Sequence, residues 1–258
     1  MKGLSFTRVV LYLITALVLF YLIFPIFVVI PVSFSSASYL QFPPPGLSLQ
    51  WYRKYFDRSD WVDATWLSIW VACLTALLAT ILGTMASLAL VRGKFRAKNL
   101  INAFMVSPLV IPAIIVAIGV YFFYARIQIV GSPWALALAH TALALPFVVI
   151  NVSATLYGFD ERLEYAAMNL GANRWQRFTQ VVLPLTQEGL IVGGTLVFTG
   201  CVTAYITPAL LGGPQVLMLE TLLYQKVNQL SDPVSASVIA VLLLAITVVV
   251  NQFLKRVA

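Results

Sequence analysis

Charged side chains are scarce in this sequence, at 10% of 258 residues, whereas hydrophobic residues make up 61%. Soluble domains carry about 25% charged residues, so this composition excludes an ordinary soluble protein and indicates a membrane protein. The formal net charge is +7. In a membrane protein an excess of basic residues indicates first which loops lie in the cytoplasm, and it does not by itself indicate a ligand. We expect no nucleic-acid partner.

Cysteine and histidine are almost absent. Cys73 and Cys201 both lie in apolar stretches, where we interpret them as packing residues rather than as a disulfide or a metal site. His140 is the single histidine, and we favour a hydrogen-bonded structural role for it over a ligand or proton-relay role. No Gly-x-x-x-x-Gly-Lys-Ser/Thr segment occurs, so the chain is not expected to hydrolyse ATP by that route. We therefore predict no catalytic residue, no metal site and no bound cofactor.

Long apolar runs are what the sequence has in abundance. Each is long enough to cross a hydrocarbon core about 30 Å thick. They predict an all-α polytopic membrane protein with one transmembrane domain over residues 1–258. The first run is too long for a signal-peptide core, so we expect it to be retained. The predicted spans lie at about residues 9–32, 63–91, 100–125, 134–157, 190–211 and 234–254.

Proline punctuates the third predicted span, at Ser107-Pro108 and at Pro112. A proline inside a helix frees a backbone carbonyl, and lipid offers that carbonyl no donor. We therefore expect this part of the span to face a neighbouring helix or a water-lined cavity.

One polar island, at about residues 158–189, separates the fourth and fifth spans. Four side chains spaced at i, i+3, i+4 and i+7 share a helical face there; they are Leu163, Ala166, Ala167 and Leu170. Gly171 is suited to end that helix in a left-handed conformation, and Asn173 to cap a second one. Trp175, Phe178 and Val182 form the apolar stripe of the second helix, which Pro184 is expected to close.

This island resembles the coupling loop of ABC importer permeases. The signature of that loop is Glu-Ala-Ala, three residues, Gly, nine residues, Ile, one residue and Leu-Pro. The positions that fit here are Ala166, Ala167, Gly171, Val181, Leu183 and Pro184. The signature glutamate falls on Tyr165, and Glu164 stands one place earlier.

The resemblance implies a permease subunit that uses ATP and Mg²⁺ only through a cytoplasmic ABC ATPase dimer. Its other implied partners are a second permease subunit, for which we favour a paralogue, an extracytoplasmic solute-binding protein and membrane lipid. The loop docks into the ATPase and rocks the spans between inward- and outward-facing states. The residues assigned to this contact are Glu164, Tyr165, Ala166, Ala167, Leu170, Gly171, Leu183 and Pro184. Glu164 is the expected charge contact.

The distribution of basic residues predicts the orientation. With six spans, eleven of the 16 Lys and Arg residues fall on the side that carries both termini and the polar island. The positive-inside rule places that side in the cytoplasm of a bacterial inner membrane. The five basic residues on the other side are Arg53, Lys54, Arg58, Arg126 and Lys226.

The substrate is inferred from two further stretches. Trp51-Tyr52 and Thr207-Pro-Ala-Leu-Leu-Gly-Gly213 resemble segments of spermidine/putrescine-type permeases. A polyamine or related amine is therefore the expected solute, with an aminophosphonate, an opine or another small solute as alternatives. The candidate pathway residues are Asp63, Thr203, Tyr205, Glu220 and Asp232. A tyrosine within a span, such as Tyr205, is more often a packing residue than a pathway residue.

Two other classes of protein fit less well. A secondary transporter would show buried ionisable residues or an inverted repeat, and neither is visible. An intramembrane hydrolase would need a nucleophile and a base, or a metal cluster, inside the spans. A lone His140 without a buried carboxylate argues against that class.

Overall fold

The structure is a computed structural model that describes residues 6–257, with side chains for all of these except residues 6, 7, 214, 255 and 257. Lys2, one of the charges used to predict the orientation, lies outside the described residues. The regular elements within them are all helices, joined by turns and loops, and an isolated bridge connects Ser35 and Leu47. Contacts divide the chain into two units, residues up to 59 with 223–244, and residues 60–222 with 245 onward.

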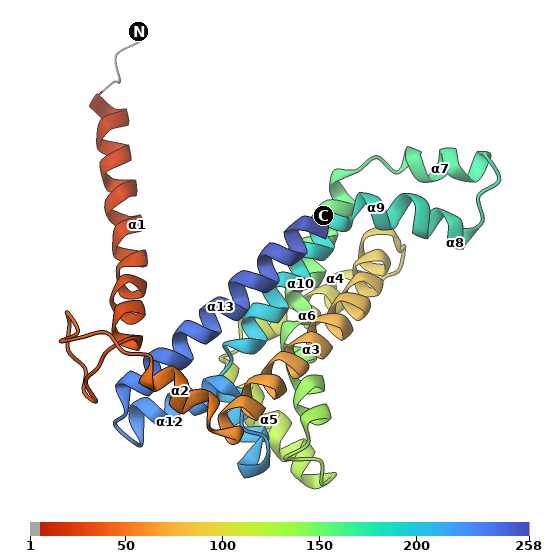
Figure 1. Cartoon of the computed structure of the whole chain (residues 1–258). Helices are drawn as coiled ribbons and strands as arrows, with labels where there is room; N and C mark the ends of the chain where they lie inside the picture. Colours follow the sequence, from red (N-terminus) through yellow and green to blue (C-terminus); the bar gives the residue numbers. More distant parts are fainter. Residues whose placement is uncertain (1–5, 258) are drawn as a thin grey trace. The chain divides into compact units, whose positions relative to one another are not determined.

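Four helices are long and apolar enough to cross a membrane (Figure 1). They are α1 (Phe6–Ser33), α3 (Ser59–Arg92), α6 (Pro133–Gly158) and α13 (Pro233–Val257). Two bent helix pairs raise the number of candidate spans to six if each pair crosses as one span. The predicted all-α membrane fold is thereby confirmed, and six remains the predicted number of spans.

The third predicted span is not one continuous helix. Helix α4 (Lys98–Val106) runs into a 3₁₀ turn at Ser107–Leu109, and α5 (Ala113–Arg126) leaves at an angle of 102°. Pro108 and Pro112 lie on either side of this break, and Pro112 has the extended backbone, with ψ 129°, that precedes α5. Two residues without a backbone N–H four positions apart account for a sharp break rather than a gentle kink.

The fifth predicted span also ends earlier than expected. Helix α10 (Gln187–Val202) stops before Thr203, and a separate short helix α11 (Ile206–Leu211) follows. Pro208 in a continuous helix would collide with the carbonyl of Ala204, so the break falls before it. A 3₁₀ turn at Gly213–Gln215 and helix α12 (Leu219–Asn228) then lead to α13.

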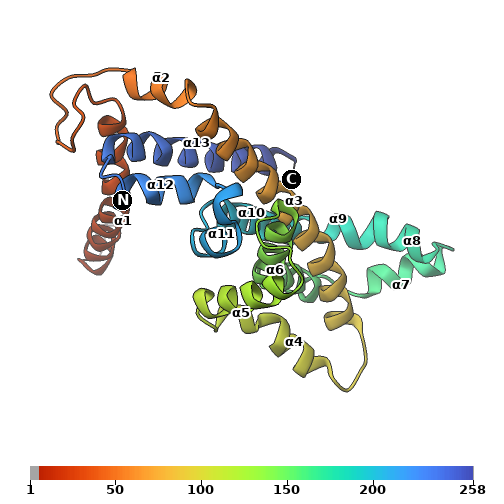
Figure 2. The same cartoon turned by 90° about the horizontal axis from the view of Figure 1, so that it is seen from below.

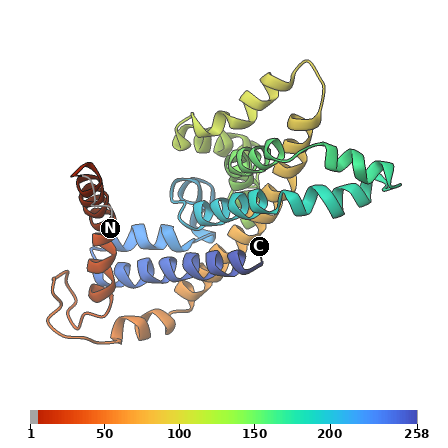
Figure 3. The same ribbon diagram turned by 90° about the horizontal axis from the view of Figure 1, so that it is seen from above.

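Helices α3, α6 and α10 form the core of the larger unit, and Figures 2 and 3 show α6 and α10 side by side. At Gly193 on α10, an added Cβ would lie 3.0 Å from the Cα of Val148 on α6. This close approach is typical of membrane helices that pack through small residues. The buried cluster consists of Ala79, Val148, Val152, Leu156, Val182 and Val197.

In the smaller unit, the segment after α1 folds back onto helix α2 (Gln50–Phe56). The Tyr52 hydroxyl lies 2.8 Å from the Ser33 hydroxyl, and Trp51 Nε1 donates to the Ser35 carbonyl at 2.9 Å. Gln50 Nε2 donates to the Ser36 carbonyl at 2.9 Å. The Trp51-Tyr52 pair singled out in the sequence therefore anchors Ser33 and Ser35 by side-chain hydrogen bonds, and Gln50 anchors Ser36.

Candidate functional site

The polar island forms a helical hairpin that projects from the ends of α6 and α10 (Figures 1 and 3). Helix α7 (Arg162–Asn169) forms the first arm. The return arm consists of α8 (Arg174–Arg177), a π-helical turn (Phe178–Val182) and α9 (Leu183–Leu185). The predicted helix–turn–helix is therefore present. We call residues 158–189 the coupling loop after the segment that they resemble, and their contact with an ATPase stays a prediction.

The turn at the hairpin tip depends on Gly171, whose φ is +88°. The Gly171 N–H donates to the Met168 carbonyl, and the Ala172 N–H donates to the Ala167 carbonyl, both at 3.0 Å. These two bonds make the Schellman motif, which needs a left-handed residue at this position. The predicted role of Gly171 as the left-handed cap of the first helix is confirmed.

Asn173 begins the return arm with a reciprocal pair of hydrogen bonds. Its side-chain oxygen accepts from the Gln176 N–H, and the Gln176 side chain accepts from the Asn173 N–H, both at 2.9 Å. This is a capping box, which satisfies two backbone donors that the helix leaves open. Between Gly171 and Asn173 the tip has only Ala172, so local hydrogen bonds fix its conformation.

Pro184 does not close the second helix, contrary to the sequence prediction. The return arm stays helical through Leu185 and bends by 68° before α10, next to the buried Thr186. The Thr186 hydroxyl donates to the Val182 carbonyl at 2.8 Å. A π turn immediately before Pro184 widens the helix, and this relieves the clash that a proline ring makes in a regular α-helix.

An ionic cluster braces the hairpin against the cytoplasmic end predicted for α3. Arg92 donates to Glu161 through Nη1 and to Glu164 through Nε, the latter at 3.1 Å. Arg177 Nε lies 3.6 Å from the other oxygen of Glu164. The Arg92 guanidinium also lies over the Phe159 ring, 4.7 Å from its centroid. Sequence reasoning missed Arg92, because its partners are some seventy residues away and no local pattern connects them.

The surface of the hairpin is apolar for a segment between two spans. Tyr165 is 59% exposed, Leu170 is 89% exposed and Trp175 is 70% exposed. Ala166 is exposed and Ala167 half-buried, while Leu183 and Pro184 are also exposed. The Glu164 side chain, in contrast, is only 14% exposed. Charged side chains are exposed as well, at Asp160, Glu161, Arg162, Arg174 and Glu188, but most of the exposed side chains of the segment are uncharged.

The candidate pathway residues lie in different places along the chain. In the larger unit, Asp63 is exposed on α3, and Thr203 is exposed after α10 with its hydroxyl donating to the Thr199 carbonyl at 2.9 Å. Tyr205 is half-buried at the start of α11. Glu220 is half-buried in the first turn of α12, and burial raises the pKa of its carboxyl group.

Asp232, in the smaller unit, already has partners. One carboxylate oxygen accepts from the Ser235 N–H at 3.2 Å and so caps α13, and the other lies 3.4 Å from Lys54 Nζ. Burial raises the pKa of Asp232, but bonding to Ser235 and Lys54 outweighs it, so this pKa lies below its usual value. The carboxylate is thereby engaged within its own unit.

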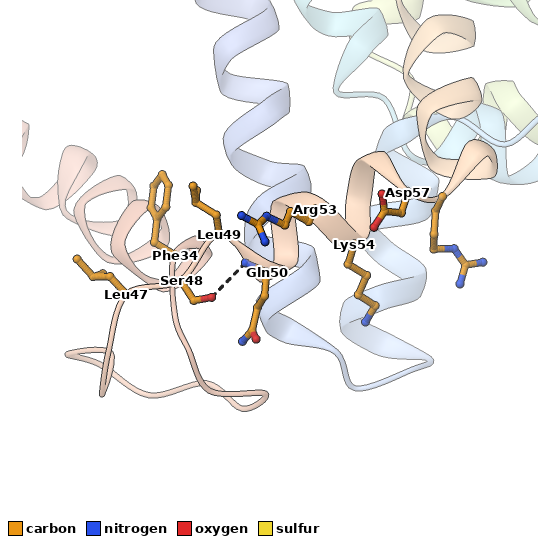
Figure 4. A pocket seen from close by; sticks show the side chains of 9 residues that line it. Phe34, Leu47, Ser48, Leu49, Gln50, Arg53, Lys54 and Asp57 are labelled. Carbon is orange, nitrogen blue, oxygen red and sulfur yellow. Dashed lines mark hydrogen bonds between the residues drawn. The ribbon is translucent and has the colours of Figure 1, made fainter.

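A pocket of about 720 Å³ lies beside Lys54 (Figure 4). Arg53, Lys54 and Arg58 line it together with the single acid Asp57. Figure 4 shows Arg53 and Lys54 pointing in different directions, so these two cations do not converge on one point. The pocket mouth is basic, whereas an amine site would need acceptors.

Comparison with known proteins connects these features. The family described as binding-protein-dependent transport system inner membrane component matches residues 79–258. That range covers more than half of the chain and contains the whole coupling loop. The chain belongs to this family. It is a permease subunit of an ABC importer, as the resemblance of the loop implied.

Several relatives cover most of the permease. The spermidine/putrescine transport system permease protein PotC of Escherichia coli is 29% identical over 238 residues, 92% of this chain and 90% of its own length. The putrescine transport system permease protein PotI of Escherichia coli is 30% identical over 73% of this chain and 69% of its own length. A probable sulfate transport system permease protein of Marchantia polymorpha is 30% identical over 71% of this chain and 70% of its own length.

Solved structures agree on the fold. A bacterial alginate ABC transporter, in complex with a periplasmic protein that holds an alginate pentasaccharide, matches with a TM-score of 0.72 at 15% identity. The match covers 96% of the permease and 93% of that chain. An inward-facing methionine ABC transporter matches with a TM-score of 0.63 at 20% identity, and the match covers 76% of the permease and 93% of that chain. At these identities the likeness concerns the fold alone.

Proposed function

We propose that this permease subunit forms half of the transmembrane pathway of an ATP-driven importer for a polyamine or a related amine. The observation that carries the substrate class is the similarity to a spermidine/putrescine permease along nearly the whole chain, the predicted outer segments included. A permease without an ATP site must receive its free energy through a contact with an ATPase. The coupling loop is the segment built for such a contact.

The exposed apolar face of the hairpin is the proposed ATPase contact. Tyr165, Leu170 and Trp175 offer large apolar side chains, and Ala166 and Ala167 let a partner approach closely. Such a face with little charge is what a buried docking surface requires. ATP and Mg²⁺ belong to the partner ATPase dimer, and this chain contributes only the mechanical joint.

Glu164 has a different part in this proposal from the direct ATPase contact expected from the sequence. Its two carboxylate oxygens face Arg92 and Arg177 of the same chain. Through Arg92, the hairpin is tied to the end of α3 as well as to α6 and α10, from which it projects. When the ATPase dimer closes and moves the loop, Arg92 and Glu164 pass the displacement to α3.

The other partners follow from the same architecture. A second permease subunit, for which we favour a paralogue, would complete the pathway, and an extracytoplasmic binding protein would deliver the solute. Both termini and the coupling loop would lie in the cytoplasm, as the excess of basic residues on that side predicts. Lipid surrounds the exposed apolar surface of the spans.

The outer mouth of the pathway must hold a cation only briefly. Asp63 and Glu220 are the proposed carboxylates there, with Thr203 and Tyr205 as polar lining. Asp232 contributes less, because Lys54 already neutralises it. An anionic substrate is the alternative, and the similarity to a probable sulfate permease is the observation that favours it.

Uptake by the reconstituted importer tests both candidates. The permease, its second subunit, its ATPase and its binding protein are placed in vesicles with ATP inside, and radiolabelled putrescine, spermidine and sulfate are supplied separately. We expect ATP-dependent uptake of an amine and none of sulfate. Uptake of sulfate without uptake of either amine would replace the amine by an anion and leave the coupling mechanism standing.

A further inference from the structure

A cavity of about 460 Å³ lies in the larger unit, between α6, α10 and the break before α5. On α6 the side chains that line it are spaced at i, i+3, i+4 and i+7 and so share one face. His140 and Phe147 are the first and last of these. Gly200 and Cys201 line it from α10. The cavity is therefore a product of the helix break that the two prolines impose.

His140 is the unusual member of this lining. Its side chain is 4% exposed, and its Nε2 atom has no hydrogen-bond partner within the described part of the chain. The expectation that His140 is a satisfied structural residue is therefore wrong for this atom. A buried polar atom without a partner destabilises the fold. In the tautomer that carries its proton on Nδ1, Nε2 is an acceptor, and a donor supplied during the transport cycle would satisfy it.

Further acceptors line the same space. Val110 and Ile111 line the cavity at the helix break and are 82% and 41% exposed, and within residues 6–257 no backbone N–H donates to their carbonyls. Thr207 adds a buried hydroxyl group, and Phe147 adds an aromatic ring. None of the lining residues is charged. An acyl chain would leave these polar groups unsatisfied, whereas an ammonium group donates up to three hydrogen bonds and is attracted to a ring face.

We propose that this cavity is a transient binding site for the ammonium group of the transported amine, with His140, the free carbonyls at the break and Phe147 as its contacts. The proposal rests on the proposed function, since it names a site for that substrate inside the pathway. Neutral acceptors without a carboxylate bind a cation weakly. Weak binding suits a step that must release the solute as readily as it takes it up.

Substitutions at His140 test the site in the reconstituted importer, with saturating putrescine-loaded binding protein. His140→Leu removes the acceptor, and we expect putrescine transported per ATP hydrolysed to fall about tenfold, the effect of losing one hydrogen bond to a charged group. His140→Gln keeps an acceptor at a similar reach and should recover most of that loss. Thr141→Val, a buried neighbour outside the cavity, is the matched control and should transport normally.

The results at His140 distinguish failure of the cavity site from failure of the proposed amine function. If His140→Leu transports as well as Thr141→Val while the wild-type importer takes up putrescine, the cavity proposal is wrong and the amine function stands. If the wild-type importer takes up no amine, both fail together. Release of the second permease subunit by His140→Leu would show that the cavity is an interface between subunits and would also overturn the proposal.

Filling the cavity gives a second and independent measurement. An added Cβ would meet no atom within 4 Å at Gly200 or at Gly119, but only Gly200 lines the cavity. We expect Gly200→Phe to abolish putrescine uptake with the complex assembled, and Gly119→Phe to retain uptake. Equal uptake by the two variants, whether high or low, would contradict the proposal.

Discussion

Gly171 is the residue on which the tip of the coupling loop depends. Its left-handed backbone costs an L-residue with a side chain about 1–2 kcal/mol, and its N–H is a donor in the turn. Gly171→Pro removes both properties, so we expect at least a tenfold loss of import with the protein still in the membrane. Gly171→Ala should lose less, because it keeps the donor.

Gly158 provides the control for that substitution. An added Cβ would meet open space there too, but the φ of Gly158 is not positive. Gly158→Ala should therefore import normally. The measurements are uptake, ATP hydrolysis and retention of the ATPase on the purified complex. Normal import by Gly171→Pro with the ATPase bound would show that the tip is not part of the joint.

Asp232 allows a second prediction at the scale of one side chain. Asp232→Asn keeps an oxygen for the α13 cap and removes the charge that faces Lys54. Because the pair is partly exposed, we expect a loss of stability below about 1 kcal/mol at neutral pH and import within twofold of normal. Asp232→Ala also removes the cap and should cost about 1 kcal/mol more.

The pH dependence of that loss has a definite sign. The pKa of Asp232 is lowered in the folded protein, so its charge stabilises the fold fully above the unfolded pKa, near 4. The contribution disappears as pH falls through the folded value. Thermal unfolding of wild type and Asp232→Asn should therefore differ at pH 7 and converge in acid. A several-fold fall in uptake by Asp232→Asn would instead return Asp232 to the pathway.

At the scale of elements, the hairpin and α3 are expected to move together. Arg92→Gln removes the ion pairs with Glu161 and Glu164, and Arg177 then remains the neighbour of Glu164. We predict ATP hydrolysis near the normal rate but about tenfold less solute moved per ATP. Arg92→Lys keeps the charge without the forked geometry and should be intermediate.

Exchanging the charges of Arg92 and Glu164 tests whether the contact between them is needed, or only the charge at each position. Arg92→Glu alone should uncouple the importer, and adding Glu164→Arg should recover part of the import, because the pair is restored with reversed polarity. The measurement is again putrescine transported per ATP. A double variant no better than Arg92→Glu would mean that the Arg92–Glu164 contact does not transmit the movement.

How far the sequence predicts these elements depends on the range of the forces that build them. The turn at Gly171 and the cap at Asn173 are set by hydrogen bonds within a few residues, so both could be predicted. Helix breaks at Pro108 and before Pro208 follow from local sterics, but the 102° angle depends on packing against α6 and α10. The ion pairs of Arg92 and the cavity beside His140 join distant segments and have no local signature.

The whole molecule is predicted to have both termini and the coupling loop in the cytoplasm. This follows from the basic residues near the loop between α3 and α4 and in the hairpin, since anionic lipid and the translocation machinery retain positive loops inside. Arg96 and Asn173 are exposed and are predicted to lie on that side, and Ser48, in the segment before α2, is predicted to lie on the other.

Single cysteines at these positions decide the orientation. In a chain with Cys73 and Cys201 replaced, we expect Ser48→Cys to react in intact cells with a thiol reagent that cannot cross the membrane. Arg96→Cys and Asn173→Cys should react only after the cells are opened. Asn173→Cys alters the cap, so Gln180→Cys, exposed on the same hairpin, serves as a second site with the cap intact. Labelling of either hairpin cysteine from outside would invert the orientation and place the coupling loop beyond the reach of any cytoplasmic ATPase.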